Sequence, residues 1–438
     1  MTDSTPPAPT RIRRPTSCVS LWATPIGLVL LLVLAAAAIG IGAPPVATCA
    51  VAVLLLTVVL GGMEIGRHPP PAYRRRMNLP RVACKLLGMT LTLAVLAFGY
   101  WLFPLYRWPL YQPFFEALEM FWPVFAVLVT PYFLDVDRRM KDPYDAYWLI
   151  GRMALGRLPE RGSGPILRRH VLGWLVKGYF LPLMFGDLAH GAIWLFQFSW
   201  SHLLSYPFVT FFTAIFQACM AIELAFVATG YLASLRLFDA HIRSVDETLL
   251  GWLAALACYA PLLEVTFTQY LGYRDGDGWA FWLQDHPTLL VVWGSLILVL
   301  MVLHTWCDSV FGVRFSNLTH RGVITNGPFR LGKHPAYVIK NLRWWMVSLP
   351  FLSMQGVDGG LRQSVLLALV GALYVLRAWT EERHLSRDPA YVAYALWIDR
   401  HGLLSWVGTL FPRLSYAHIH QDAVLRAQRH LDTAHKDL

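Results

Sequence analysis

The sequence predicts an all-α, polytopic membrane helix bundle of about ten transmembrane helices. Of its 438 residues, 56% are hydrophobic and only 15% are charged, whereas a soluble globular chain is about one quarter charged. The apolar residues also fall into runs of about 20, the length of helix that crosses a bilayer. Composition and segmentation together place the chain among integral membrane proteins.

Ten apolar segments are long enough to span a membrane. The first follows the basic residues Arg11 to Arg14 and so resembles a secretory signal. It is too long for one, and no clear cleavage site follows, so we interpret it as an uncleaved first helix. The predicted spans are 22–42, 46–65, 86–106, 114–135, 171–199, 206–236, 249–271, 288–312, 337–355 and 361–380.

The loops between these spans alternate in charge. The loops after the second and fourth spans are rich in arginine, whereas the intervening loops are poor in Lys and Arg or carry acids such as Asp275, Asp277 and Asp285. Because basic residues accumulate on the cytoplasmic side, we predict cytoplasmic termini and a cytoplasmic segment after the eighth span. The formal net charge of +10 is therefore interpreted as topology information and not as a nucleic-acid surface.

Two residue classes give only weak evidence of chemistry. The six cysteines show no CxxC pair or metal-ligand spacing, so we expect reduced structural thiols and no bound metal. Charged groups at membrane depth are costly, and each calls for a reason. They either join helices or line a polar head-group pocket or proton path, and their roles are left open: Glu116, Glu119, Lys177, Asp187, His190, Glu223, Glu264, His304 and Asp308.

Polar residues gather in two pieces near the end of the chain. The first, from Arg314, reads RFSNLTHRGVITNGPFRLGKHPAYVIKNLRWW; the second, after an apolar hairpin, begins at Arg377 and reads RAWTEERHLSRDPAYVAY. Loop glycines let backbone N–H groups approach a ligand. Arg377 and Glu381 share one helix face, where they can bind both ends of a zwitterion or orient an acid. The two pieces indicate a polar cofactor pocket at the membrane surface.

These pieces resemble the C-terminal signature of isoprenylcysteine carboxyl methyltransferases and, more distantly, that of phospholipid N-methyltransferases. The resemblance covers about residues 310 to 400 and rests on these motif residues: Gly327–Arg330, Lys333–Tyr337, Arg377, Glu381, Glu382, Tyr391 and Tyr394. The sequence departs from the family at Phe329, Lys333 and Ile339, where tyrosine, arginine and glycine are usual. The resemblance implies S-adenosylmethionine bound by the last two membrane helices and the loops at their cytoplasmic ends.

The resemblance also implies residue roles. Arg377 would orient an acceptor carboxylate, and Glu382 is assigned with it as catalytic; Glu382 or His384 would be the base for an amine acceptor. Tyr337 with Trp344 or Trp345 would wall the pocket, and no metal is implied. The expected cofactor contacts are Arg321, Gly322, Val323, Ile324, Gly327, Phe329, His334, Pro335, Ala336, Tyr337 and Glu381.

The sequence thus predicts an integral membrane S-adenosylmethionine-dependent methyltransferase acting on a lipidic or prenylated acceptor, with its active site on the cytoplasmic side. We divide the chain into an N-terminal tail (1–21), a membrane region of unknown role (22–285), a methyltransferase-like module (286–414) and a polar tail (415–438). One alternative is a sterol-reductase-type enzyme using NADPH, and another is a non-enzymatic lipid transporter or scaffold. The sequence identifies neither the acceptor nor the oligomeric state.

Overall fold

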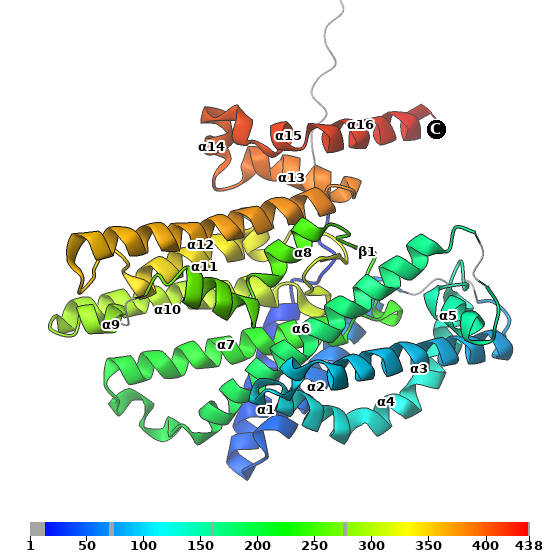
Figure 1. Cartoon of the computed structure of the whole chain (residues 1–438), viewed down its shortest axis with the longest axis horizontal. Helices are drawn as coiled ribbons and strands as arrows, with labels where there is room; N and C mark the ends of the chain where they lie inside the picture. Colours follow the sequence, from blue (N-terminus) through cyan, green and yellow to red (C-terminus); the bar gives the residue numbers. More distant parts are fainter. Residues whose placement is uncertain (1–13, 70–73, 159–160, 275–277, 437–438) are drawn as a thin grey trace, which may run out of the picture.

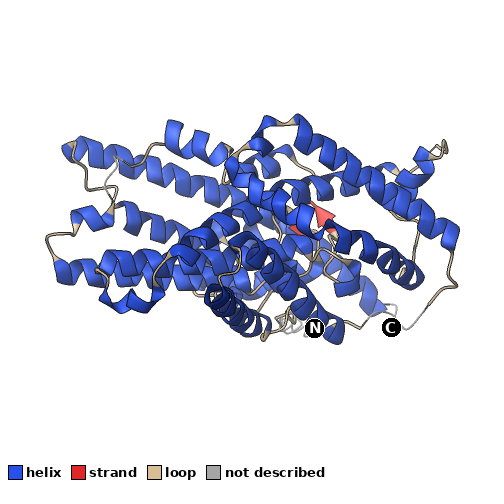
Figure 2. Ribbon diagram, turned by 90° about the horizontal axis from the view of Figure 1, so that it is seen from below, coloured by secondary structure: helices blue, strands red, loops and turns tan. Residues whose placement is uncertain are grey.

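Helices make up almost all of the regular structure in the computed structural model, which describes residues 14–69, 74–158, 161–274 and 278–436. The predicted all-α class is confirmed, and the described chain has one pair of two-residue strands, drawn in red in Figure 2. Arg11 to Arg13, Asp275 and Asp277, which entered the topology argument, lie outside the described residues.

Eight helices of the described chain are long and apolar enough to cross a membrane. This architecture supports an integral membrane protein, as the composition predicts. The eight are α1 (Ala23–Ile41), α2 (Pro45–Arg67), α3 (Leu79–Leu102), α4 (Gln112–Arg139), α6 (Gly164–Gln197), α7 (Phe208–Leu232), α10 (Pro287–Ser309) and α12 (Gly356–Leu385).

Shorter elements connect and cover these spans. The short helices are α5 (Ala146–Ala154), α8 (Leu249–Leu256), α9 (Trp279–Trp282), α11 (Pro335–Ser348), α13 (Pro389–His401), α14 (Ser405–Leu410), α15 (Tyr416–Ile419) and α16 (Gln421–Lys436). Short 3-10 helices are η1 (Pro104–Arg107), η2 (Pro109–Tyr111), η3 (Trp200–Ser205), η4 (Arg236–Phe238), η6 (Gly312–Arg314), η7 (Gly327–Arg330) and η8 (Pro412–Leu414), and η5 (Glu264–Tyr270) is a π-helix. Strand β1 (Ser244–Val245) pairs antiparallel with β2 (Thr319–His320).

Two of the ten predicted spans are not long helices. Segment 249–271 folds as the eight-residue α8 and then the π-helix η5, and segment 337–355 contains only the 14-residue α11. Fourteen residues rise about 21 Å, less than the roughly 30 Å of a hydrocarbon core. Pro261 and Pro350 follow the two short helices, and proline disfavours helical backbone in the residue before it. Hydropathy alone does not register that interruption.

The N-terminal and C-terminal segments pack together as one bundle. Helix α7 packs against α2 and α6 on one side and against α10 on another, as Figure 1 shows. Leu56, Phe180 and Phe226 are fully buried in the resulting core. Helices α3 and α5 approach closely at Gly88, and the absence of a side chain there permits the contact, since a Cβ at Gly88 would collide with the Tyr147 carbonyl. The region 22–285 therefore forms one wall of whatever site the last helices build.

The segments predicted to be cytoplasmic gather at one end of this bundle. The Arg75 amide donates to the Arg138 carbonyl at 2.8 Å, and Arg168 forms an ion pair with Glu247. Strand β1 joins β2, and the Nε2 atom of His320 lies 3.2 Å from an Asp388 oxygen. Helices α13 to α16 stack on the outer side of α12, coloured orange to red in Figure 1. Which side of the membrane this end faces stays a prediction.

Candidate functional site

A cavity of about 750 Å³ lies between α6, α7, α10, α11 and α12. It brings together both motif pieces and side chains from the N-terminal region. Gly327, Pro335 and Glu382 are not among its lining residues. The predicted site residues that line it are Arg321, Gly322, Val323, Ile324, Phe329, His334, Ala336, Tyr337, Arg377 and Glu381.

Glu381 joins the two motif pieces at the cavity wall. The Tyr337 hydroxyl donates to the Glu381 Oε1 atom at 2.5 Å, and the Arg377 Nε donates to the same oxygen at 3.1 Å. The His334 ring stacks on that of Tyr337 with 5.4 Å between centroids, and its Nδ1 lies 3.8 Å from Glu381 Oε2. A carboxylate, a phenol, an imidazole and a guanidinium thus meet within one hydrogen-bonded group.

Arg377 is buried, with 4% of its surface exposed, and several partners fix the orientation of its guanidinium. Its Nη2 donates to the Asn317 Oδ1 atom at 2.6 Å. Its guanidinium carbon lies 5.0 Å from the Tyr337 ring centroid and 5.2 Å from that of Tyr259, close enough for cation–π attraction. The Asn317 side-chain amide in turn donates to the hydroxyls of Tyr231 and Tyr259, at 2.8 and 3.1 Å. Asn317, Tyr231 and Tyr259 were not among the predicted site residues.

Glu382 belongs to a separate ionic group and is not itself among the cavity-lining residues. Its carboxylate oxygens lie 2.9 Å from Lys333 Nζ, 3.1 Å from His334 Nε2 and 3.4 Å from His420 Nε2. Adjacent residues on a helix point about 100° apart, so Glu381 and Glu382 serve different groups. The close contacts fasten the His334 loop and the C-terminal helices to α12. Its predicted role as a base stays a prediction.

The C-terminal tail covers this ionic group. Tyr416 is fully buried, and its hydroxyl lies 2.7 Å from the Ser386 hydroxyl. Burial raises the pKa of Tyr416 to about 12 because it disfavours the charged phenolate; the neutral phenol can donate or accept a hydrogen bond. The Lys333 Nζ lies 4.8 Å from the Tyr416 ring centroid. Sequence analysis found no chemistry in this tail, yet the tail contacts Ser386 at the end of α12 and Lys333, and Lys333 lines the cavity.

Arg321 uses its side chain to hold backbone in place. Its guanidinium donates to the carbonyls of Ala240, Gly230, Phe315 and Val313 at 2.6 to 2.8 Å. These four bonds use four of the five guanidinium N–H groups, so the side chain serves mainly to hold backbone and has little left to offer a ligand. The next residue, Gly322, has φ +117°, a conformation that favours glycine. Beside them, burial lowers the pKa of His320 and the nearby Asp388 opposes that shift.

The structure also locates the two tryptophans that were predicted to wall the pocket and the histidine that was predicted as the alternative base. Trp344 packs against Tyr374 and Phe267, with ring centroids 5.2 and 6.0 Å apart, and neither Trp344 nor Trp345 is among the cavity-lining residues. His384, the alternative base, does line the cavity, and its Nε2 lies 3.1 Å from the Ser244 hydroxyl. The aromatic side chains that do line the cavity are tyrosines and phenylalanines with one tryptophan: Tyr259, Tyr337, Tyr374, Tyr391, Tyr394, Phe311, Phe315, Phe329 and Trp108.

In comparisons with protein-family models, curated proteins and solved structures, no family model, curated protein or solved structure matches this chain. The functional argument therefore rests on the motif residues and on the geometry of the cavity.

Proposed function

We propose that the protein is an integral membrane methyltransferase that uses S-adenosylmethionine and acts on a lipidic or lipid-linked acceptor. The observation that supports it best is the convergence of both motif pieces on one cavity. Tyr337 and Arg377 come from different helices, and both donate to the same Glu381 oxygen. This convergence supports the single pocket that the resemblance implies for its two halves.

The residues present suit such a cofactor. A volume of about 750 Å³ lies within the roughly 300–1,000 Å³ of small-molecule pockets. The Glu381 carboxylate can accept hydrogen bonds from an ammonium group, and the His334 ring beside it offers a further polar contact. Tyr337 and Tyr374 supply flat apolar surface on the same wall. Acidic and basic groups on one wall fit a zwitterionic ligand.

When bound, S-adenosylmethionine supplies an electrophilic methyl group on a sulfonium centre. The protein's contribution is to position the acceptor and keep water out, which suffices for in-line displacement. Arg377, fixed by Glu381 and Asn317, orients an acceptor carboxylate in the cavity. A carboxylate has no proton to lose, so no base is needed; an amine acceptor would pass its proton to His384 or, after a rearrangement, to Glu382.

The N-terminal helices supply the apolar part of the same cavity. Leu183 and Met184 of α6 and Met220, Leu224 and Val227 of α7 line it. Such side chains accommodate hydrocarbon, because apolar surface removed from water is favourable. In this proposal the region 22–285 forms the chamber for the lipid portion of the acceptor.

Calorimetric titration of the detergent-purified protein tests the proposal. S-adenosylmethionine and NADPH are titrated separately into the wild type, Glu381→Ala and His334→Ala, with Asp358→Ala, at the exposed start of α12, as the matched control. We expect micromolar S-adenosylmethionine binding that both site variants lose and the control keeps. Binding of NADPH alone would favour the reductase, and binding of neither ligand would favour the transporter or scaffold.

A further inference from the structure

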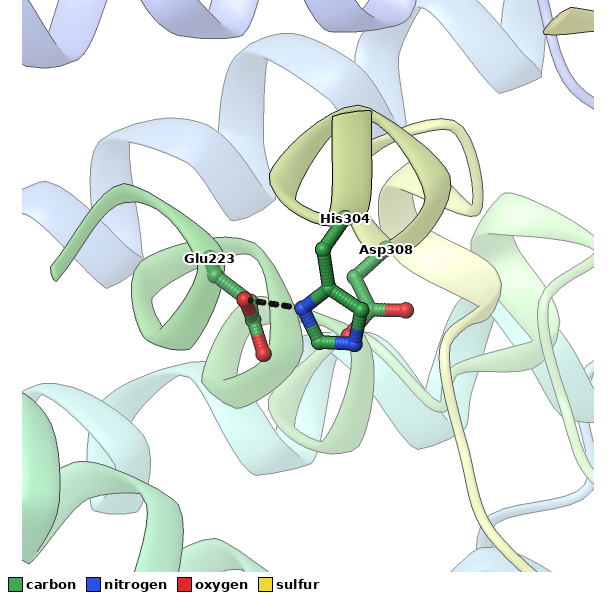
Figure 3. Close-up of side chains that lie close together, drawn as sticks. All are labelled: Glu223, His304 and Asp308. Atoms are coloured by element: carbon green, nitrogen blue, oxygen red, sulfur yellow. Dashed lines mark hydrogen bonds and ion pairs between the residues drawn. The ribbon is translucent and has the colours of Figure 1, made fainter. Parts of the chain in front are cut away.

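A second polar group faces the same cavity from two long helices. It consists of Glu223 on α7 with His304 and Asp308 on α10, and all three line the cavity. His304 and Asp308 are four residues apart, so they share one face of α10. Figure 3 shows the three side chains turned toward one another, with the Glu223–His304 hydrogen bond dashed.

The geometry brings one nitrogen and two carboxylate oxygens together. The candidate ligand atoms all lie within 4.8 Å of one another. The His304 Nδ1 is 2.9 Å from a Glu223 oxygen, and these two residues are 3% and 8% exposed. A Glu–His pair that only joins two helices would need one carboxylate. Asp308 adds a second one beside it, at a depth where uncompensated charge is costly.

The nearby cations do not pair directly with these carboxylates. Among the residues that the structure describes, no Lys or Arg nitrogen comes within 4.0 Å of a carboxylate oxygen of Glu223 or Asp308. Lys340 lies over the rings of Trp344 and Tyr374, at 5.4 and 5.6 Å, and Arg343 lies 5.2 Å from the Phe216 ring centroid. These two cations act on the group only from a distance.

We propose that Glu223, His304 and Asp308 bind a divalent transition-metal ion. An imidazole with two carboxylates is a mixed nitrogen and oxygen ligand set that suits Zn²⁺. The same set also suits Mn²⁺ or Fe²⁺ when water oxygens complete the coordination. Such an ion would compensate both carboxylates at once. Three protein ligands leave further coordination positions open, and the cavity gives a water or a ligand atom access to them. The site is independent of the methyltransferase proposal.

Metal binding is measured directly on untagged, detergent-purified protein. The protein is stripped with a chelator and titrated with Zn²⁺ or with Co²⁺, whose visible absorption reports coordination by protein ligands. We expect about one ion per chain and a Zn²⁺-dependent rise in the midpoint of thermal unfolding. Glu223→Gln, His304→Gln and Asp308→Asn should each weaken binding by about 100-fold.

Two other carboxylates of the same cavity provide matched controls. Asp187 and Glu264 line the cavity but are not members of the cluster, so Asp187→Asn and Glu264→Gln should leave binding unchanged. Asp308→Asn guards against misfolding as an explanation, because it leaves the Glu223–His304 bond in place. A titration of S-adenosylmethionine on the same samples separates this outcome from the fate of the methyltransferase proposal. Absence of Zn²⁺ and Co²⁺ binding, or binding that the cluster variants retain, would overturn the metal site.

Discussion

The hydroxyl of Tyr337 donates to Glu381 at 2.5 Å, although 44 residues separate the two. Tyr337 lies in the first turn of α11, and Glu381 lies in the last turns of α12. The hairpin formed by α11 and α12 thus brings the second motif piece into contact with the first. The proposed cofactor wall depends on this contact.

Tyr337→Phe removes the donated hydrogen bond and keeps the ring. A hydrogen bond to a charged group contributes roughly 1.5 kcal/mol or more, so S-adenosylmethionine affinity should fall by about tenfold. Calorimetry measures the change. Tyr100→Phe, which removes a hydrogen bond to the Gly178 carbonyl in another part of the bundle, should leave affinity unchanged. Equal affinities in Tyr337→Phe and wild type would show that the Tyr337–Glu381 hydrogen bond does not support the cofactor.

Asn317 should act by positioning Arg377. Asn317→Ala removes the oxygen that accepts from Arg377 and should lower methyl transfer by about 10- to 100-fold, an effect typical of misplaced groups. Asn317→Asp keeps an accepting oxygen and should recover most of that loss, while S-adenosylmethionine affinity stays similar in both. A purely structural role predicts instead that both variants lose stability and activity together.

The fully buried Tyr416 should stabilise the site from the tail. Tyr416→Ala leaves a large cavity, and its free energy of unfolding should fall by roughly 3–5 kcal/mol. Tyr416→Phe loses only the contact with Ser386 and should cost about 1 kcal/mol. Denaturant titration in detergent compares the two variants. If Tyr416→Ala unfolds like the wild type, the tail does not pack as described.

The stability of the protein should depend on pH through His241, in the loop after η4. Burial lowers the pKa of His241 to about 4, and Arg236 and Arg243 add to the shift while Asp239 opposes it. An unfolded histidine titrates near 6.5. The contribution of the neutral imidazole is therefore complete above pH 6.5 and is lost as the pH falls from there toward about 4.

Thermal unfolding at several pH values tests this dependence. His241→Asn cannot take up the proton, so its unfolding midpoint should fall less than that of the wild type between about pH 7 and pH 5. The exposed His401 provides the control, and His401→Asn should follow the wild-type curve. Parallel curves for His241→Asn and wild type would contradict the assignment.

Local sequence patterns predicted most of the fold and part of the site. Long apolar runs identify helices such as α1 and α7, because a helix that crosses a bilayer needs about 20 apolar residues. The pairing of Arg377 with Glu381 follows from helical spacing alone. The motif also predicted that His334 and Tyr337 would join them.

The remaining features depend on contacts between distant positions. Asn317 meets Arg377 across 60 residues, and Glu223 meets His304 across 81; no local period encodes either contact. The spacing of His304 and Asp308 was visible, but the sequence alone did not show which helix would face them. Likewise, nothing in the polar tail indicated that His420 would reach Glu382.

Transfer of a labelled methyl group tests the central claim most directly. Purified protein in lipid nanodiscs is incubated with S-adenosylmethionine labelled in the methyl group and with extracted membrane lipids, and label is counted in the organic phase. The proposal predicts label in a lipid product with wild type and with Asp358→Ala, and almost none with Arg377→Ala or Glu381→Ala. An organic phase that stays unlabelled with wild-type protein, or equal labelling by all four proteins, would contradict it.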